Sequence, residues 1–94
     1  MTHRAEVDPN VWNQKWNEVF KAQPADVVQL VHDEFVVQHL GHWLVSSLMH
    51  KKEYQLAEYA LQNLDPSKSW PDIRHLPAER TPQIDRLIVQ YGIS

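Results

Sequence analysis

Cysteine is absent from this 94-residue sequence, and glycine occurs only twice. Without cysteine there is no disulfide framework, no thiolate zinc site, no iron–sulfur cluster and no cysteine nucleophile. Two glycines are too few for a glycine-rich phosphate-binding loop, and few for a β-rich domain with many tight turns. No serine stands in a G-x-S-x-G elbow. These absences predict a protein that is not an enzyme and needs no cofactor.

Acidic residues outnumber basic ones. The sequence has 12 Asp and Glu and 9 Lys and Arg, which gives a formal net charge of -3. The longest basic run is the pair Lys51-Lys52. A nucleic-acid binder needs a basic stripe and a membrane-surface helix needs a basic face, so both classes are disfavoured. The acidic excess is in turn too small and too dispersed for a mimic of nucleic acid. We expect no nucleic-acid partner and no membrane partner.

A long apolar run is also missing. The nearest one, residues 35–49, is interrupted by a glutamine, two histidines and two serines, and it is too short to span a bilayer. Residues 1–8 contain no apolar stretch of the secretory type. We therefore expect no signal peptide and a cytoplasmic location.

What the chain does contain is ordinary for one globular domain. Hydrophobic residues make up 43% and charged residues 22% of the sequence, which differs from a disordered composition. A chain of this length buries about 65% of the surface that its unfolded form exposes, enough for one modest core. We expect a single domain over residues 1–94, in which residues 1–7 form a frayed leader.

The apolar residues recur at helical spacing, and no segment shows strand-like alternation of useful length. Two helices begin with the same signal, a capping residue followed by proline, at Asp8-Pro9 and at Thr81-Pro82. Pro24 prevents the first helix from continuing, and Gly92 suits the end of the last one. The pattern predicts helices over residues 9–22, 54–64 and 82–91.

The segment over residues 25–50 is apolar on one side in its first half and on nearly the opposite side in its second half. The apolar face changes between Phe35 and Val36. One interpretation is a single long central helix that packs against different partners on its two sides. The other is a break near residues 32–34, with Asp33 capping a new helix. We favour the continuous helix, because a sharp kink usually has glycine or proline as its cause and neither stands there.

Two further expectations depend on this long helix. Gly41 would stand alone in its interior, where glycine costs about 1 kcal/mol relative to alanine, so we expect a close helix crossing there. A small bundle also has difficulty in covering both sides of one helix. We therefore expect a homodimer with two-fold symmetry, which is the commonest way to bury a leftover apolar face.

Histidine is the one unusually frequent residue, with 6 copies in the chain. Four of them fall on one face of the expected long helix: His32, His39, His42 and His50. His39 and His42 lie about one turn apart and could share a metal ion, but no spacing recruits the further ligands that zinc needs. The simplest interpretation is a polar helix face, with no metal site. The alternatives are a metal site or a pH-responsive contact, since histidine titrates near neutral pH.

The connection over residues 65–81 carries apolar side chains among three prolines. Trp70 either pins this connection onto the helices or stands out as an anchor for a partner, since Trp and Arg are frequent at binding hot spots. The prolines lower the entropy cost of ordering the segment. We predict partner binding at Trp70, Ile73, Arg74 and Leu76. The other tryptophans lie on or beside apolar stripes and are expected in the core: Trp12, Trp16 and Trp43.

The sequence thus predicts an all-α protein with four helices, a long central element and a proline-rich connection before the last helix. With no catalytic constellation, no cofactor motif and no basic footprint, the function expected by elimination is that of a protein–protein interaction module. Such a module would be an adaptor, a small subunit of a complex or an inhibitor of a partner protein. The alternative is a histidine-based protein that binds metal or senses pH.

Overall fold

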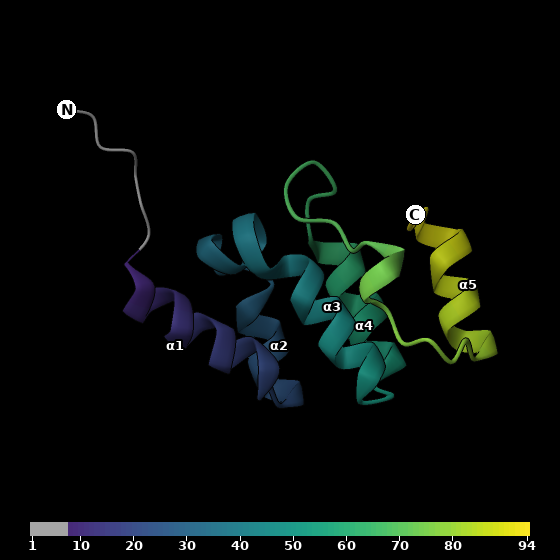
Figure 1. Ribbon diagram of the computed structural model, residues 1–94, viewed down its shortest axis with the longest axis horizontal. Coiled ribbons are helices and arrows are strands. Elements are labelled where there is room, and N and C mark those ends of the chain that lie inside the picture. Colours follow the sequence, from purple (N-terminus) through teal and green to yellow (C-terminus); the bar gives the residue numbers. More distant parts are fainter. Residues whose placement is uncertain (1–7) are drawn as a thin grey trace.

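The computed structural model describes residues 8–94, and every regular element in that range is a helix (Figure 1). In chain order these are α1 (Pro9–Phe20), α2 (Pro24–Leu30), η1 (Val36–Leu40), α3 (Gly41–His50), α4 (Tyr54–Asn63), η2 (Ile73–His75) and α5 (Pro82–Tyr91). Helices cover 68% of the described residues. The all-α expectation is therefore confirmed, and the four-helix description fits roughly. The expected frayed leader, residues 1–7, lies outside the described range.

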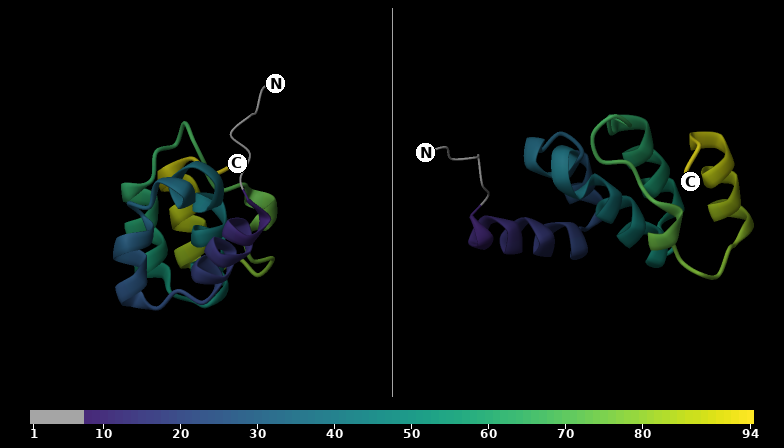
Figure 2. Two further views of the ribbon diagram at one scale, coloured as in Figure 1. Left: turned by 90° about the vertical axis from the view of Figure 1, so that its left-hand side faces the viewer. Right: turned by 45° about the horizontal axis from the view of Figure 1, so that its top comes forward.

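The helices form an elongated body with α3 and α4 side by side in its middle (Figure 1). α1 and α2 lie at one end of the body and α5 lies at the other, as Figure 2 also shows. α3 packs against both α1 and α4, whereas α5 packs against α4. Among the described helices, none has the length and apolar character that crossing a bilayer requires.

Side chains cap the two helices that begin with the proline signal. The Asp8 carboxylate accepts the backbone N–H of Asn10 at 2.8 Å, and the Thr81 hydroxyl accepts that of Ile84 at 3.3 Å. Each contact satisfies an N–H group that the first helical turn leaves without a partner. Gly92 takes a left-handed conformation (φ 66°) and ends α5. The predicted ranges of α1, α4 and α5 agree with the observed ones to within two residues at each end.

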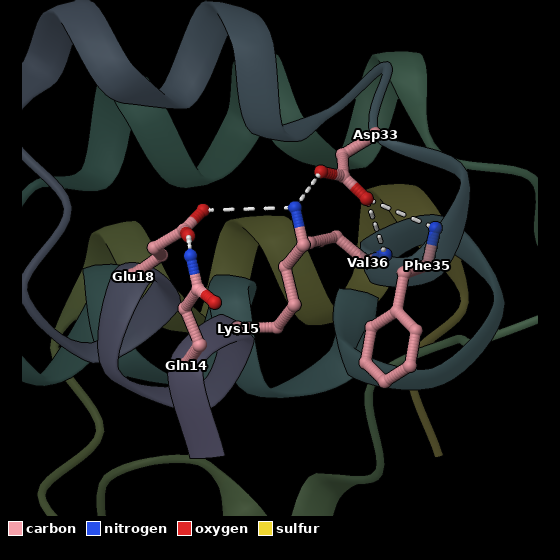
Figure 3. Close-up of polar contacts among 6 residues, drawn as sticks. All are labelled: Gln14, Lys15, Glu18, Asp33, Phe35 and Val36. Atoms are coloured by element: carbon pink, nitrogen blue, oxygen red, sulfur yellow. Dashed lines mark hydrogen bonds and ion pairs between the residues drawn. The ribbon is translucent and has the colours of Figure 1, made fainter. Parts of the chain in front are cut away.

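The long central helix expected over residues 25–50 is wrong, because the chain turns between α2 and η1. α2 ends at Leu30, whose carbonyl accepts the backbone N–H of Asp33 at 3.1 Å. Asp33 then caps a new helical segment. Its Oδ1 accepts the backbone N–H groups of Phe35 at 3.0 Å and of Val36 at 3.2 Å (Figure 3). The second interpretation of the sequence, a break capped by Asp33, is the correct one.

Lys15 of α1 explains how this turn is stabilised without glycine or proline. Its Nζ lies 2.5 Å from Oδ2 of Asp33 and 3.8 Å from a carboxylate oxygen of Glu18 (Figure 3). Burial disfavours the charged form of Asp33, but the hydrogen bonds from Lys15 and from two backbone amides outweigh burial and lower the pKa of this carboxyl. The ion pair joins residues 18 positions apart, so no local sequence signal contains it.

The change of apolar face between Phe35 and Val36 is a consequence of the turn. Both halves of the segment are buried within one chain: Val31 is 1% exposed before the turn, and Leu44 is 0% exposed after it. The homodimer was expected because one apolar side of the long helix would stay uncovered, and no such uncovered side is found in residues 8–94. The large apolar side chains that stay exposed there are single valines and one phenylalanine on three helices: Val11, Phe20, Val28 and Val89. Homodimerisation stays a prediction, now without that argument.

The connection from α3 to α4 contains neither glycine nor proline, and Lys52 takes the left-handed conformation there (φ 64°). The backbone N–H of Glu53 reaches back to the carbonyl of Leu48 at 2.8 Å and closes the end of α3. A lysine in this conformation costs about 1–2 kcal/mol, because its Cβ crowds the following carbonyl oxygen. The packing of α3 against α4 therefore has to outweigh a local cost in the turn that joins them.

We expect Asp33→Ala to lower the free energy of unfolding by about 1–2 kcal/mol, because it removes the cap of η1 and the ionic partner of Lys15. Asp33→Asn is the matched control, since its side-chain oxygen still caps the segment but carries no charge. Its loss should stay below about 1 kcal/mol. Urea denaturation of both variants at pH 7 measures the difference, and equal losses would show that the cap contributes nothing.

Candidate functional site

The proline-rich connection is fastened to α3 through residues 65–77, which we call the 65–77 segment. Gly41 lies against the carbonyl of Ser69, and a Cβ added to Gly41 would stand only 2.9 Å from that oxygen. The Ser69 hydroxyl oxygen lies 3.2 Å from the backbone nitrogen of His42 and 2.9 Å from its Nδ1. The Ser46 hydroxyl donates to the carbonyl of His75. Three residues of one helix thus hold the segment at two places.

This fastening explains the isolated glycine of α3. We expected a close helix crossing at Gly41, but its nearest neighbours are the backbone of Ser69 and the side chain of Leu64, at 3.3 Å from the added Cβ. Leu64 follows the last residue of α4, and Ser69 belongs to the connection. The close approach is therefore made by a connecting segment rather than by the axis of a second helix.

The short helix η2 orients the charged part of the 65–77 segment. Asp72 caps it by accepting the backbone N–H of Arg74 at 2.8 Å. The guanidinium of Arg74 folds back onto the same carboxylate, with Nη2 2.8 Å from Oδ2. The hydrogen bonds from Arg74 hold the pKa of the Asp72 carboxyl well below its usual range. The Arg74 side chain is 81% exposed, so a positive charge is presented to solvent in a defined orientation.

A shallow, open depression of about 400 Å³ lies where this segment meets α1 and the start of α3. Two indoles and three imidazoles form much of its wall: Trp12, Trp70, His39, His42 and His75. Lys68 and Asp72 add one charge of each sign. The depression is the place in residues 8–94 where the predicted partner-binding segment meets the predicted histidine face.

Aromatic rings pack in continuous contact beside this depression. The ring centroid of Trp43 lies 4.9 Å from that of His42 and 4.7 Å from that of His75, and the two imidazoles are 6.0 Å apart. Trp43 also packs edge-on against Trp16 at 5.1 Å. Aromatic pairs of this kind contribute about 0.5–1.5 kcal/mol each beyond their buried area. The rings join α1, α3 and the 65–77 segment into one unit.

The two central imidazoles differ in their hydrogen bonds. Burial lowers the pKa of His42 below its ordinary value of 6.5, and the nearby His75 lowers it further, while Asp72 acts in the opposite direction. A neutral His42 with no hydrogen on Nδ1 satisfies both contacts with Ser69. Ser69 Oγ then accepts a hydrogen bond from the His42 backbone N–H and donates its hydroxyl hydrogen to Nδ1. Nδ1 of His75 is buried and has no hydrogen-bond partner within residues 8–94.

The four residues predicted to bind a partner do not share one exposed surface. Trp70 and Ile73 are half-buried and pack against the core, whereas Arg74 is exposed. Leu76 is 5% exposed and belongs to the core itself. Leu76 therefore anchors the 65–77 segment from inside, and the accessible part of the prediction is Trp70, Ile73 and Arg74.

The four histidines of the predicted face do not come together, because the turn at Asp33 separates His32 from the others and His50 lies at the far end of α3. His39 and His42 line the depression, but His32 lies in the exposed turn after α2 and His50 lies at the exposed end of α3. His75 joins the first pair instead. No sequence signal assigned His75 to a site, and none marked Trp12, Ser69 or Asp72 as site residues. His42 and Ser69 are 27 positions apart, so no motif spacing signals their contact.

A second and larger depression, of about 720 Å³, lies between α1 and α2. It is lined mainly by polar side chains, among them Lys15, Glu18 and Asp33. Lys15 already pairs with both carboxylates (Figure 3), so these charges serve the turn before η1. In the described part of the chain, no group of three or more histidine or carboxylate side chains is arranged to hold a metal ion.

In comparisons with known proteins, no protein-family model, no curated protein and no solved structure matches the chain.

We expect Gly41→Ala to destabilise the fold by about 1–3 kcal/mol, although alanine forms helices better than glycine by about 1 kcal/mol. The added Cβ would push against the Ser69 carbonyl and displace the 65–77 segment. Gly92→Ala is a useful control, because nothing lies within 4 Å of its added Cβ and only the positive φ is strained. Thermal unfolding measures both losses. A Gly41→Ala protein more stable than the wild type would contradict the close approach.

Removal of metal by a chelator should leave the melting temperature unchanged. A structural zinc ion contributes many kcal/mol to folding, so its loss would be conspicuous in a domain of this size. The measurement is a pair of thermal melts, with and without the chelator. A drop of about 10 °C or more, roughly 2 kcal/mol, would indicate a bound metal and favour the metal-binding alternative.

Proposed function

We propose that this protein is a non-enzymatic, regulatory interaction module that binds another protein at the depression around Trp70. The observation that carries the proposal is the placement of this indole in the wall of an open depression between two buried neighbours, Ser69 and Pro71. A side chain held in this way loses little conformational freedom when a partner binds. The segment thus offers a large aromatic surface at a small entropy cost.

The chemistry of the surrounding residues fits a protein partner better than a small ligand. Trp12 and Trp70 give the depression apolar faces, and the same segment as Trp70 carries a half-buried Ile73 and an exposed Arg74. Trp and Arg are enriched among the residues that dominate binding energy at protein interfaces. A small-molecule site usually encloses most of its ligand, whereas this depression is shallow and open. An adaptor, a small subunit and an inhibitor would all use such a surface.

The metal-binding alternative lacks support from the described residues, since no three potential ligands come together there. The pH-sensing alternative has a specific observation in its favour, the pair of imidazoles packed on Trp43. A homodimer and a cytoplasmic location remain predictions from the sequence.

We expect Trp70→Ala to weaken partner binding by about thirtyfold or more, which corresponds to about 2 kcal/mol. The matched control is Val89→Ala on α5, where the side chain is 81% exposed and apolar. Wild type and both variants are used as bait in an extract of the source cells. A protein retained by wild type and by Val89→Ala, but not by Trp70→Ala, is then produced, and its Kd is measured calorimetrically.

The stability of the bait decides how this result is interpreted, because Trp70 also packs against the core. Melting curves of all three proteins fix a temperature at which each is folded, and the Kd values are compared there. If Trp70→Ala lowers the melting temperature but binds the partner as tightly as Val89→Ala, Trp70 only pins the segment and the proposed site is wrong. Arg74→Ala gives a second test without a packing defect, since its side chain is exposed.

A further inference from the structure

We infer that the contact of His42 with Ser69, one of the two places where α3 holds the 65–77 segment, depends on a neutral His42, so that acidification loosens the segment at Ser69. The Ser46 contact and the buried Leu76 keep the rest of the segment in place. This loosening needs no partner, whereas its effect on partner binding rests on the proposed function.

Ser69 Oγ joins the segment to α3 through two contacts with His42, one to its backbone nitrogen and one to its ring. It accepts the backbone N–H of His42 at 3.2 Å, and it lies 2.9 Å from Nδ1 of the same residue. When Nδ1 carries no hydrogen, the Ser69 hydroxyl donates to it and both contacts are satisfied. When His42 is protonated, backbone N–H and Nδ1–H both point at one oxygen. The Ser69 hydroxyl hydrogen must then turn elsewhere, although Ser69 is only 6% exposed.

The charged and titratable groups around His42 do not compensate for this loss. The 65–77 segment places His75, Asp72 and Lys68 around the depression that His42 lines, and η1 adds His39. α1 contributes Trp12 to the same wall, and Trp12 does not titrate. Asp72 is the one carboxylate among the residues lining this depression, and Arg74 already holds it. Protonated His42 would therefore face a second imidazole 6.0 Å away with little opposing charge free for it.

The direction of the pH effect follows from the pKa of His42, which lies below 6.5 in the fastened state. Once the contact with Ser69 opens, the ring regains water and its pKa returns toward the ordinary value. Between the two values the open state binds more protons, so the closed contact loses stability as the pH falls. The contact should therefore be complete above about pH 6.5 and weaken progressively below it.

The test is an NMR titration of backbone amides and histidine rings between pH 7.5 and 5.0 at constant ionic strength. In the wild type we expect the amide signals of residues 67–70, around Ser69, to shift together with the ring signal of His42. His42→Asn should abolish this joint shift, because asparagine places an acceptor oxygen near the position of Nδ1 and does not titrate. His50→Asn, at the exposed end of the same helix, should leave it unchanged.

Ser69→Ala provides a second variant that does not alter the titrating ring. In this protein His42 should still titrate, but the amides of the segment should no longer follow it. The inference is wrong if the wild-type amides stay in place while His42 titrates, or if they shift equally in His42→Asn. The proposed function fails separately, when Trp70→Ala binds its partner normally at neutral pH.

Discussion

Helix α3 has to be covered on almost its whole circumference, and this requirement shapes the rest of the molecule. Its six consecutive residues 44–49 are all buried. Six residues in a row point in every direction around a helix of 3.6 residues per turn, so a single packing face cannot hide them. α1, α4 and the 65–77 segment pack against α3 and supply this cover. Even a polar position in the run is used, because Ser46 binds the carbonyl of His75.

The helices whose signals are local could be predicted from the sequence. A capping side chain and a following proline act within one turn, so Asp8 and Thr81 mark the starts of α1 and α5 without help from elsewhere. The turn at Asp33 is different. Asp33 could be recognised as a possible cap, but its ionic partner Lys15 belongs to α1 and lies 18 positions away, where no local signal marks it. The turn at Lys52 is equally hard to predict from the sequence. Its left-handed conformation is usually adopted by glycine, which has no Cβ, so a lysine gives no sign of it.

The candidate site was predicted in part, and the reason lies in how its residues are brought together. Composition alone pointed to Trp70, because an indole in a proline-rich connection is unusual. The apolar character of Leu76 was equally visible, but it marks a core residue rather than a contact. The four-histidine face failed because His32 precedes the break at Asp33 and His50 lies at the far end of α3 from His42. His75 reaches His42 only through the packing of the 65–77 segment on α3, which no spacing encodes.

The helix η1 has a consequence for how this chain tolerates changes in length. Its residues Val36–Leu40 form π turns, which fit one more residue into a turn than the α-helix does. Deleting one residue here would let the stretch close as an ordinary α-helix with nearly the same total rotation, so the preceding chain would keep its direction relative to α3. Asp33 would then stay within reach of Lys15 on α1. A single deletion is thus better tolerated in η1 than inside α3, where it would rotate the two ends of the helix by about 100° relative to each other.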